Sequence, residues 1–298
     1  MRTVSPDLTM CLASARIFSS VTARNPFSSL SVCCFILWAG RGKDDFFSPA
    51  YNAALKNKAE QGIIKPTMHV CMEGEQVFQG FPRETIPFFL ELRFHNEKAF
   101  MDQNRERYIK EVREPFYEFI LDLGQKMLLI DPDFEVRPHK CLSRINRDTR
   151  FTKDKSPYRD HLWLAFRRAG ADKDGMPFYW FELSPENVSW GVGVWGENRN
   201  MMDKMRREME ARPLDYVNLL PCLSQADFVM GGQWWKKMKA PDSIPPDIRP
   251  LYVMRSLYFS KRETKMQWIY QKNLVNRVFK DFMAMAPVYR MLRGNAQE

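Results

Sequence analysis

The sequence predicts an α+β fold, in which an antiparallel sheet of four to five strands is flanked by N-terminal and C-terminal helices. Three observations predict it. Helical periodicity runs through residues 85–127, strand-like segments rich in aromatic and β-branched residues fill 134–195, and helical periodicity returns at 274–286. Short turns join the strand-like segments, which favours an antiparallel meander because parallel strands need long crossover connections.

Helical spacing of apolar residues defines the N-terminal part of the fold. Helices are expected at Thr85–Arg93 and Asn96–Tyr108, and a third should begin near Pro115, because a first helical turn does not need the N–H that proline lacks. The third helix repeats its apolar residues at intervals of three and four, at Phe116, Phe119, Ile120 and Leu123. The turn signal Asp131-Pro132-Asp133 ends this region.

Short segments rich in aromatic and β-branched residues define the sheet. Strands are expected at Phe134–Asn146, His161–Arg168, Phe178–Leu183 and Val188–Trp195. In the last of these, bulky residues alternate with Ser189, Gly191 and Gly193. Because side chains alternate between the two faces of a strand, one face should be bulky and the other nearly bare.

The C-terminal third returns mainly to helices. A stripe of methionines at helical spacing is expected to fill the core, at Met201, Met202, Met205 and Met209. A further strand is expected at Leu251–Ser260 and a closing amphipathic helix at Leu274–Ala286. Pro287 should end or kink that helix, because proline cannot donate the helical hydrogen bond.

Residues 1–71 differ in character from the rest of the chain. They are rich in Ser, Thr and Arg near the start, show no sustained period, and end in Pro66 and the two methionines Met68 and Met72. We interpret 1–71 as a poorly ordered extension or a mis-assigned start, and 72–298 as a single α+β domain.

Composition narrows the class of protein. Hydrophobic residues make up 45% of the chain, enough for a substantial core, and the net charge of +9 favours acidic partners. The six cysteines form no CxxC pair, and the longest early apolar run is about half the ~20 residues that span a bilayer. We expect a cytoplasmic protein with no membrane partner, no metal and no cofactor, and leave its oligomeric state open.

Most of the positive charge lies in one segment, residues 137–168. It holds ten Lys and Arg against three Asp, a net of +7 out of the chain's +9. Within it, residues 144–159 read RINRDTRFTKDKSPYR. This run resembles the signature of the bacterial and fungal family catalogued as domain of unknown function 2461. The resemblance extends from about Phe78 to Arg293, and it implies the family's fold but no activity.

The chain departs from the family pattern near the signature and before it. His95 stands where the family more often has Asn, and Ala99 where it often has Trp. Arg159 and Asp160 replace the usual Lys and Thr. These departures leave the central run intact but give no support to a role for an Asn pair at positions 95 and 96.

Three interpretations of the basic run remain open. In the favoured one, surplus cations bind a phosphate- or carboxylate-bearing ligand, through Arg144, Arg147, Arg150, Lys155 and Arg159. In the second, the protein is an enzyme acting on an anionic substrate, with Asp148 as acid or base and Tyr158 as proton donor or orienting group. In the third, the run is structural, and Asp148 and Asp154 pair with its cations.

Nucleic acid is a possible but less favoured partner of the basic run. Three aromatic residues are expected on strands near the basic run: Trp163, Tyr179 and Trp180. Aromatic rings beside cations are typical of a surface on which bases stack. Aromatic residues in a sheet beside helices are usually core, however, and the sequence carries no nucleic-acid-binding signature.

Other motifs do not carry a function. Gly191–Gly196 matches G-x-G-x-x-G, but the glycines continue a hairpin strand, and a dinucleotide turn needs a strand followed by a helix in a βαβ unit. The four histidines lack the spacing of a helical metal site. Cys141 lies beside Lys140 and near Arg144, whose charges would lower its pKa and make it more reactive, but an ordinary strand cysteine is the favoured interpretation.

Overall fold

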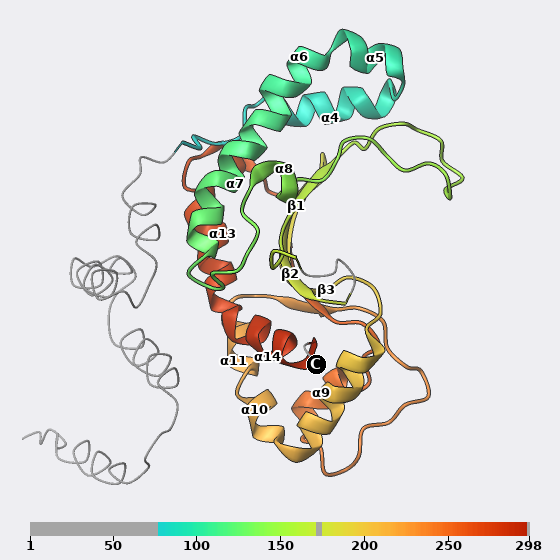
Figure 1. The fold of residues 1–298 in the computed structure, drawn as a ribbon, viewed down its shortest axis with the longest axis vertical. Helices are drawn as coiled ribbons and strands as arrows, with labels where there is room; N and C mark the ends of the chain where they lie inside the picture. The colour runs from blue at the N-terminus through green and yellow to red at the C-terminus, as the bar shows by residue number, and fades with distance from the viewer. Residues whose placement is uncertain (1–76, 171–174, 297–298) are drawn as a thin grey trace, which may run out of the picture. The chain divides into compact units, whose positions relative to one another are not determined.

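The computed structural model describes residues 77–170 and 175–296 (Figure 1). Every described residue belongs to one compact unit, which lies within Lys65–Glu298. The extension expected at residues 1–71 therefore lies outside the described residues, and so does its boundary at Met72.

A five-stranded sheet forms the centre of the domain. Its strands are β1 (Leu162–Phe166), β2 (Pro177–Leu183), β3 (Val188–Val194), β4 (Val229–Gly231) and β5 (Tyr258–Glu263). They pair in the order β1-β2-β3-β5-β4, and every pairing is antiparallel. With the helices on either side of it in sequence, this sheet confirms the predicted α+β class.

Helices precede and follow the sheet in the sequence. Before it come α4 (Thr85–Phe94), α5 (Lys98–Gln103), α6 (Arg105–Tyr108), the π-helical η2 (Ile109–Arg113), α7 (Glu114–Met127) and α8 (Pro138–Cys141). Between its strands and after it come α9 (Arg199–Ala211), α10 (Pro213–Val217), α11 (Leu220–Gln225), the 3-10 helix η3 (Pro246–Ile248), α12 (Arg249–Tyr252), the 3-10 helix η4 (Gln267–Tyr270), α13 (Leu274–Ala284) and α14 (Ala286–Ala296). Among the described residues, no helix is long and apolar enough to span a bilayer.

The hydrophobic core lies between one face of the sheet and the helices α7, α13 and α14 (Figure 1). Tyr179 and Phe181 of β2 and Trp190 and Val192 of β3 point into it and are fully buried. The indole N–H of Trp190 donates to Asp281 on α13 at 3.0 Å, which satisfies the one polar atom that this side chain brings into the core. The methionine stripe of α9 is also buried, as predicted.

One expected strand was wrong, and a second was wrong in part. Phe134–Asn146 forms no strand, because Pro138 begins the short helix α8 within it and only isolated bridges flank that helix. Residues 249–252 form α12, so the strand expected at Leu251–Ser260 begins only at Tyr258. The three residues of β4 were not predicted, since so short a segment carries no period.

The closing helix is broken as expected, but the chain does not leave helical structure. The first helix ends at Ala284, and α14 starts at Ala286 with Pro287 in its first turn. A first helical turn does not need the N–H that proline lacks, which explains why Pro287 can begin a second helix.

Candidate functional site

The second face of the sheet, which we call the open face, is less completely buried than the core face, although Ala165, Phe178 and Ser189 on it are buried. The register places Trp163 opposite Glu182, and Ala165 opposite Trp180. Directly paired residues point to the same side of a sheet, so Trp163, Trp180 and Glu182 share this face. These three side chains are half-buried, and Tyr258 is 38% exposed, whereas the core-facing side chains of β2 and β3 are fully buried.

Two glycines shape the open face. Trp180 lies opposite Gly191, and a Cβ on Gly191 would overlap the indole ring. A Cβ on Gly193 would overlap the Cα and Cβ atoms of Tyr258. Trp180 meets Tyr258 edge-on, with 5.9 Å between the ring centroids. The glycines therefore let aromatic rings lie close against β3, and they belong to an antiparallel hairpin strand rather than to a βαβ unit.

The cationic run forms a loop, residues 144–159, which we call the basic loop (Figure 1). Its base is closed by an antiparallel bridge between Asn146 and Tyr158 and by two backbone hydrogen bonds of 2.8 Å. In these, the amide of Arg147 donates to Pro157, and the amide of Arg159 donates to Ile145. Asn96, between α4 and α5, binds the backbone of Tyr158 through its side chain.

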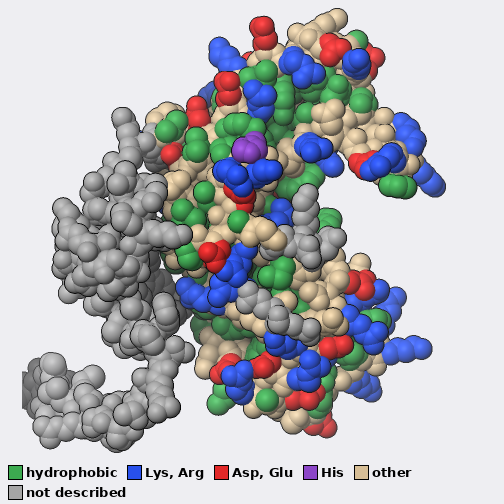
Figure 2. All heavy atoms as spheres, in the orientation of Figure 1, with side chains coloured by type: hydrophobic (Ala, Val, Ile, Leu, Met, Phe, Trp, Pro, Cys, Tyr) green, Lys and Arg blue, Asp and Glu red, His purple; other side chains and the backbone are tan. Residues whose placement is uncertain are grey.

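Three of the five predicted binding residues have partners inside the basic loop. Arg147 pairs with Asp154, and Arg150 pairs with Asp148 at 2.8 Å. The Lys155 ammonium donates to the carbonyl of Thr149 at 2.8 Å. These contacts hold the shape of the loop, and Figure 2 shows Lys and Arg gathered where the loop projects from the domain.

The other two predicted residues, Arg144 and Arg159, have no carboxylate partner among the described residues. The Arg144 side chain is exposed. The Arg159 guanidinium lies over the ring of Trp163, 4.7 Å from its centroid, and its Nε is buried without a hydrogen-bond acceptor in the described structure. Burial, and then the charge of nearby Arg147, lower the pKa of Arg159 below its ordinary value. Arg159 is thus a partly desolvated cation whose charge no protein anion neutralises directly.

The residues of the enzymatic interpretation have a different environment. The Arg150 side chain and then its backbone N–H donate to Asp148, which lowers the pKa of Asp148 to about 2. A carboxylate with so low a pKa is a weak proton acceptor at neutral pH. Tyr158 is buried, and its backbone is held by Asn96. This arrangement favours recognition of charge over proton transfer.

A second network supports the root of the loop and was not found from the sequence. Arg93 of α4 donates to Asp160 at 2.5 Å and pairs with Glu186 in the turn between β2 and β3. His161 contacts Asp160 through Nδ1 at 2.9 Å and stacks against Trp163. These contacts join residues distant in sequence, so no local pattern could have indicated them.

The remaining candidate groups carry no site. The described residues contain no group of three or more His, Cys, Asp or Glu side chains that could hold a metal ion. Burial raises the pKa of the Cys141 thiol to about 12, opposite in direction to the effect considered for Lys140 and Arg144. The thiol donates to the carbonyl of Glu135 at 3.0 Å. Cys141 itself ends the helix α8 and does not lie in a strand.

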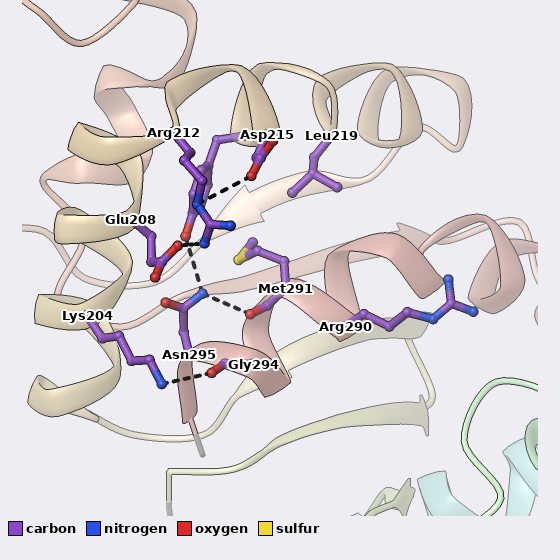
Figure 3. A pocket seen from close by; sticks show the side chains of 10 residues that line it. Lys204, Glu208, Arg212, Asp215, Leu219, Arg290, Met291, Gly294 and Asn295 are labelled. Carbon is purple, nitrogen blue, oxygen red and sulfur yellow. Dashed lines mark hydrogen bonds and ion pairs between the residues drawn. The ribbon is translucent and has the colours of Figure 1, made fainter. Parts of the chain in front are cut away.

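A separate hollow of about 310 Å³ lies between α9, α10 and α14 (Figure 3). Its cations are largely occupied: Arg212 pairs with Glu208, and the Lys204 ammonium donates to the carbonyl of Gly294 at 3.1 Å. The Arg290 side chain extends away from this cluster in Figure 3. These contacts join α9 to α14. Most of the cations around this hollow, unlike Arg159, therefore already have protein partners.

These features define an antiparallel α+β domain that carries a projecting basic loop beside an open aromatic sheet face. Residues 84–291 match the family described as "Conserved hypothetical protein (DUF2461)", and the chain belongs to that family. The match includes the whole basic loop and confirms the resemblance seen in residues 144–159. The family description assigns no activity, and no curated protein matches the chain.

Proposed function

We propose that this protein recognises a phosphate- or carboxylate-bearing ligand through the basic loop. The binding groups are the predicted set of Arg144, Arg147, Arg150, Lys155 and Arg159. The observation that carries the proposal is the state of Arg159, a half-buried cation stacked on Trp163 whose Nε lacks an acceptor among the described residues.

An oxyanion is the partner that this guanidinium lacks. A buried donor without an acceptor costs free energy, and an incoming phosphate or carboxylate oxygen would remove that cost. Trp163 holds the guanidinium plane in one orientation, so little side-chain entropy is lost when the ligand binds. Arginine also presents two parallel N–H groups, which match the geometry of both kinds of oxyanion.

The five residues take two roles in this proposal. Arg144 and Arg159 contact the ligand directly, because the described residues offer them no carboxylate. Arg147 and Lys155 fix the shape of the loop through their partners within it, and the exposed Arg150, which pairs with its near neighbour Asp148, adds positive charge to the loop. They also maintain a positive potential that attracts an anion toward the direct contacts.

The test is calorimetric titration with inorganic phosphate, using Arg159→Gln and a matched control. Arg277 is the control because it also stacks on a tryptophan, Trp268, but its guanidinium already binds Glu263 at 2.6 Å. Arg159→Gln should weaken phosphate binding at least about tenfold, since a hydrogen bond to a charged group contributes about 1.5–3 kcal/mol. Arg277→Gln, checked for folding by its melting temperature, should leave the affinity unchanged.

Two results would overturn the proposal. One is phosphate binding that persists at full affinity in both Arg144→Gln and Arg159→Gln. The other is loss of binding in Arg290→Gln, which would assign the anion to the hollow beside α14 instead.

A further inference from the structure

The open face presents aromatic rings to solvent on three of its strands. Trp163 of β1 and Trp180 of β2 are half-buried, and Tyr258 of β5 is 38% exposed. From β1 to β5 the sheet crosses three strand spacings, about 14 Å in total. The fold does not require large rings on this face, because the opposite face already supplies the buried core. Partly exposed aromatic rings gathered on one surface are typical of a binding site.

Cations stand at both ends of the row across the sheet that contains Trp163. The row runs from Trp163 through Glu182 and Ser189 to Arg262, as the strand register gives it. Arg159 lies on Trp163 at one end, and the exposed Arg262 stands at the other end with no ion-pair partner among the described residues. Arg159 therefore covers part of the Trp163 ring, whereas Trp180 and Tyr258 lie in the neighbouring rows of the sheet.

Glu182 gives the row a polar centre. The described residues offer it no ion pair, and it lies directly opposite Trp163. A carboxylate in this position repels a phosphate but accepts a hydrogen bond from an exocyclic amino group of a base. Phosphates would therefore lie at the arginine borders and bases near the centre.

We infer that the anionic ligand is single-stranded nucleic acid, with bases stacked on Trp163, Trp180 and Tyr258 and phosphates at Arg159 and Arg262. The inference rests on the proposed function, because Arg159 is shared by both. Exposed aromatic rings with cations nearby suit a strand whose bases are unpaired and accessible. A free phosphate would use the arginines and leave the rings in water, and a duplex would keep its bases inside the helix.

The test measures fluorescence anisotropy of end-labelled oligodeoxycytidylate and oligocytidylate, whose bases carry an exocyclic amino group, with inorganic phosphate titrated in parallel. Trp163→Leu and Tyr258→Leu should each weaken oligonucleotide binding by about 5- to 150-fold, the range for loss of one stacked base. Tyr258→Leu should change phosphate affinity by no more than about twofold. Trp163→Leu should also weaken phosphate binding, because Trp163 orients the Arg159 guanidinium. Arg262→Gln should reduce the slope of log affinity against log salt concentration by about 0.7, the value for one phosphate contact on a single strand.

The matched control is Trp268→Leu. Trp268 also carries an arginine on its ring, Arg277, but it packs against Trp190, which faces the core side of the sheet. It should therefore leave oligonucleotide affinity unchanged. Trp180→Leu is a third test variant, used only if its melting temperature shows that it folds, because its ring lies against Gly191.

The outcomes separate this inference from the proposed function. Phosphate binding that depends on Arg159, with oligonucleotides bound no more tightly than phosphate, overturns the inference alone. Oligonucleotide binding that is indifferent to Trp163→Leu and Tyr258→Leu, or matched by a duplex of equal length, overturns it as well. Binding of neither phosphate nor oligonucleotide overturns both proposals.

Discussion

The side-chain amide of Asn96 forms two hydrogen bonds with the backbone of Tyr158. Its Nδ2 donates to the Tyr158 carbonyl and its Oδ1 accepts from the Tyr158 amide, both at 2.9 Å. The two residues are 62 positions apart, and Asn96 follows α4 while Tyr158 closes the base of the basic loop. One side chain thus ties the N-terminal helices to the segment that carries Arg159.

Replacing Asn96 with alanine should loosen that base. The variant leaves a partly buried amide and carbonyl without partners, which costs about 1–3 kcal/mol and lowers the melting temperature by about 2–10 °C. Phosphate affinity should fall with it, since Arg159 is the next residue. The control is Asn276→Ala, whose exposed side chain has only a 3.4 Å contact with Asn273. Equal melting temperatures for Asn96→Ala and the wild type would contradict this role.

Adding one methyl group to β3 should destabilise the sheet. A Cβ on Gly193 would overlap the Cα and Cβ atoms of Tyr258, so two strands must move apart. We expect Gly193→Ala to cost about 1–3 kcal/mol, measured by urea unfolding. Gly294→Ala is the control, because nothing lies within 4 Å of its added Cβ on α14. In a helix that change should stabilise by up to about 1 kcal/mol, and a loss there equal to that of Gly193→Ala would refute the steric explanation.

Asp131 should make the fold sensitive to acid. Burial raises the pKa of this carboxyl, but hydrogen bonds from Tyr289 at 2.7 Å, from the Asp133 amide and from Arg293 at 3.0 Å outweigh it, so the pKa lies below its ordinary value. A lowered folded-state pKa stabilises the fold above the unfolded pKa near 4, and that contribution is lost as the pH falls through the folded value.

The measurement compares wild type with Asp131→Asn by urea unfolding from pH 7 to pH 3. At pH 7 the variant should be less stable by about 2–4 kcal/mol, since it removes charge-assisted hydrogen bonds from a side chain that is 1% exposed. The difference should shrink as the pH approaches 3. Asp133→Asn, whose side chain is 58% exposed, should show little of either effect. A difference that stays constant with pH would contradict the assignment.

The sequence predicted those parts of the fold in which one side of an element is apolar. The alternation of bulky residues with Gly191 and Gly193 gave β3 and its bare face, and the repeat from Phe116 to Leu123 gave α7. The strand predicted for residues 134–146 was wrong. The segment has the aromatic and branched residues typical of a strand, but Pro138 starts a helical turn within it. Composition was a weaker guide there than one local backbone constraint.

The candidate site was less accessible to sequence reasoning because it depends on register and on distant contacts. Trp163, Tyr179 and Trp180 form one group by composition, yet the pairing puts Tyr179 in the core and the two tryptophans on the open face. Asn96 carried no local signal for its contact with Tyr158. The dense cationic run did indicate where charge accumulates, but not which cations keep protein partners.

Substitutions of Arg147 and Arg150 can distinguish residues that hold the loop together from residues that bind the ligand. We predict that Arg147 is structural and Arg150 functional. Asp154, the partner of Arg147, also accepts from the backbone and hydroxyl of Ser156, so this pair joins two parts of the loop, and the Arg147 side chain is 31% exposed. The Arg150–Asp148 pair links near neighbours, and its arginine is 76% exposed, where solvent weakens the ion pair.

Arg147→Ala should therefore lower the urea midpoint measurably, while Arg150→Ala leaves it unchanged and weakens phosphate binding. The pKa of Asp148 near 2 keeps its carboxylate charged throughout the neutral range, so this contrast should be the same at pH 6 and pH 8. Raised salt should diminish the phosphate effect of Arg150→Ala, because an exposed charge acts on the ligand through solvent. The division between the two residues fails if Arg150→Ala destabilises the protein as much as Arg147→Ala and neither variant changes phosphate affinity.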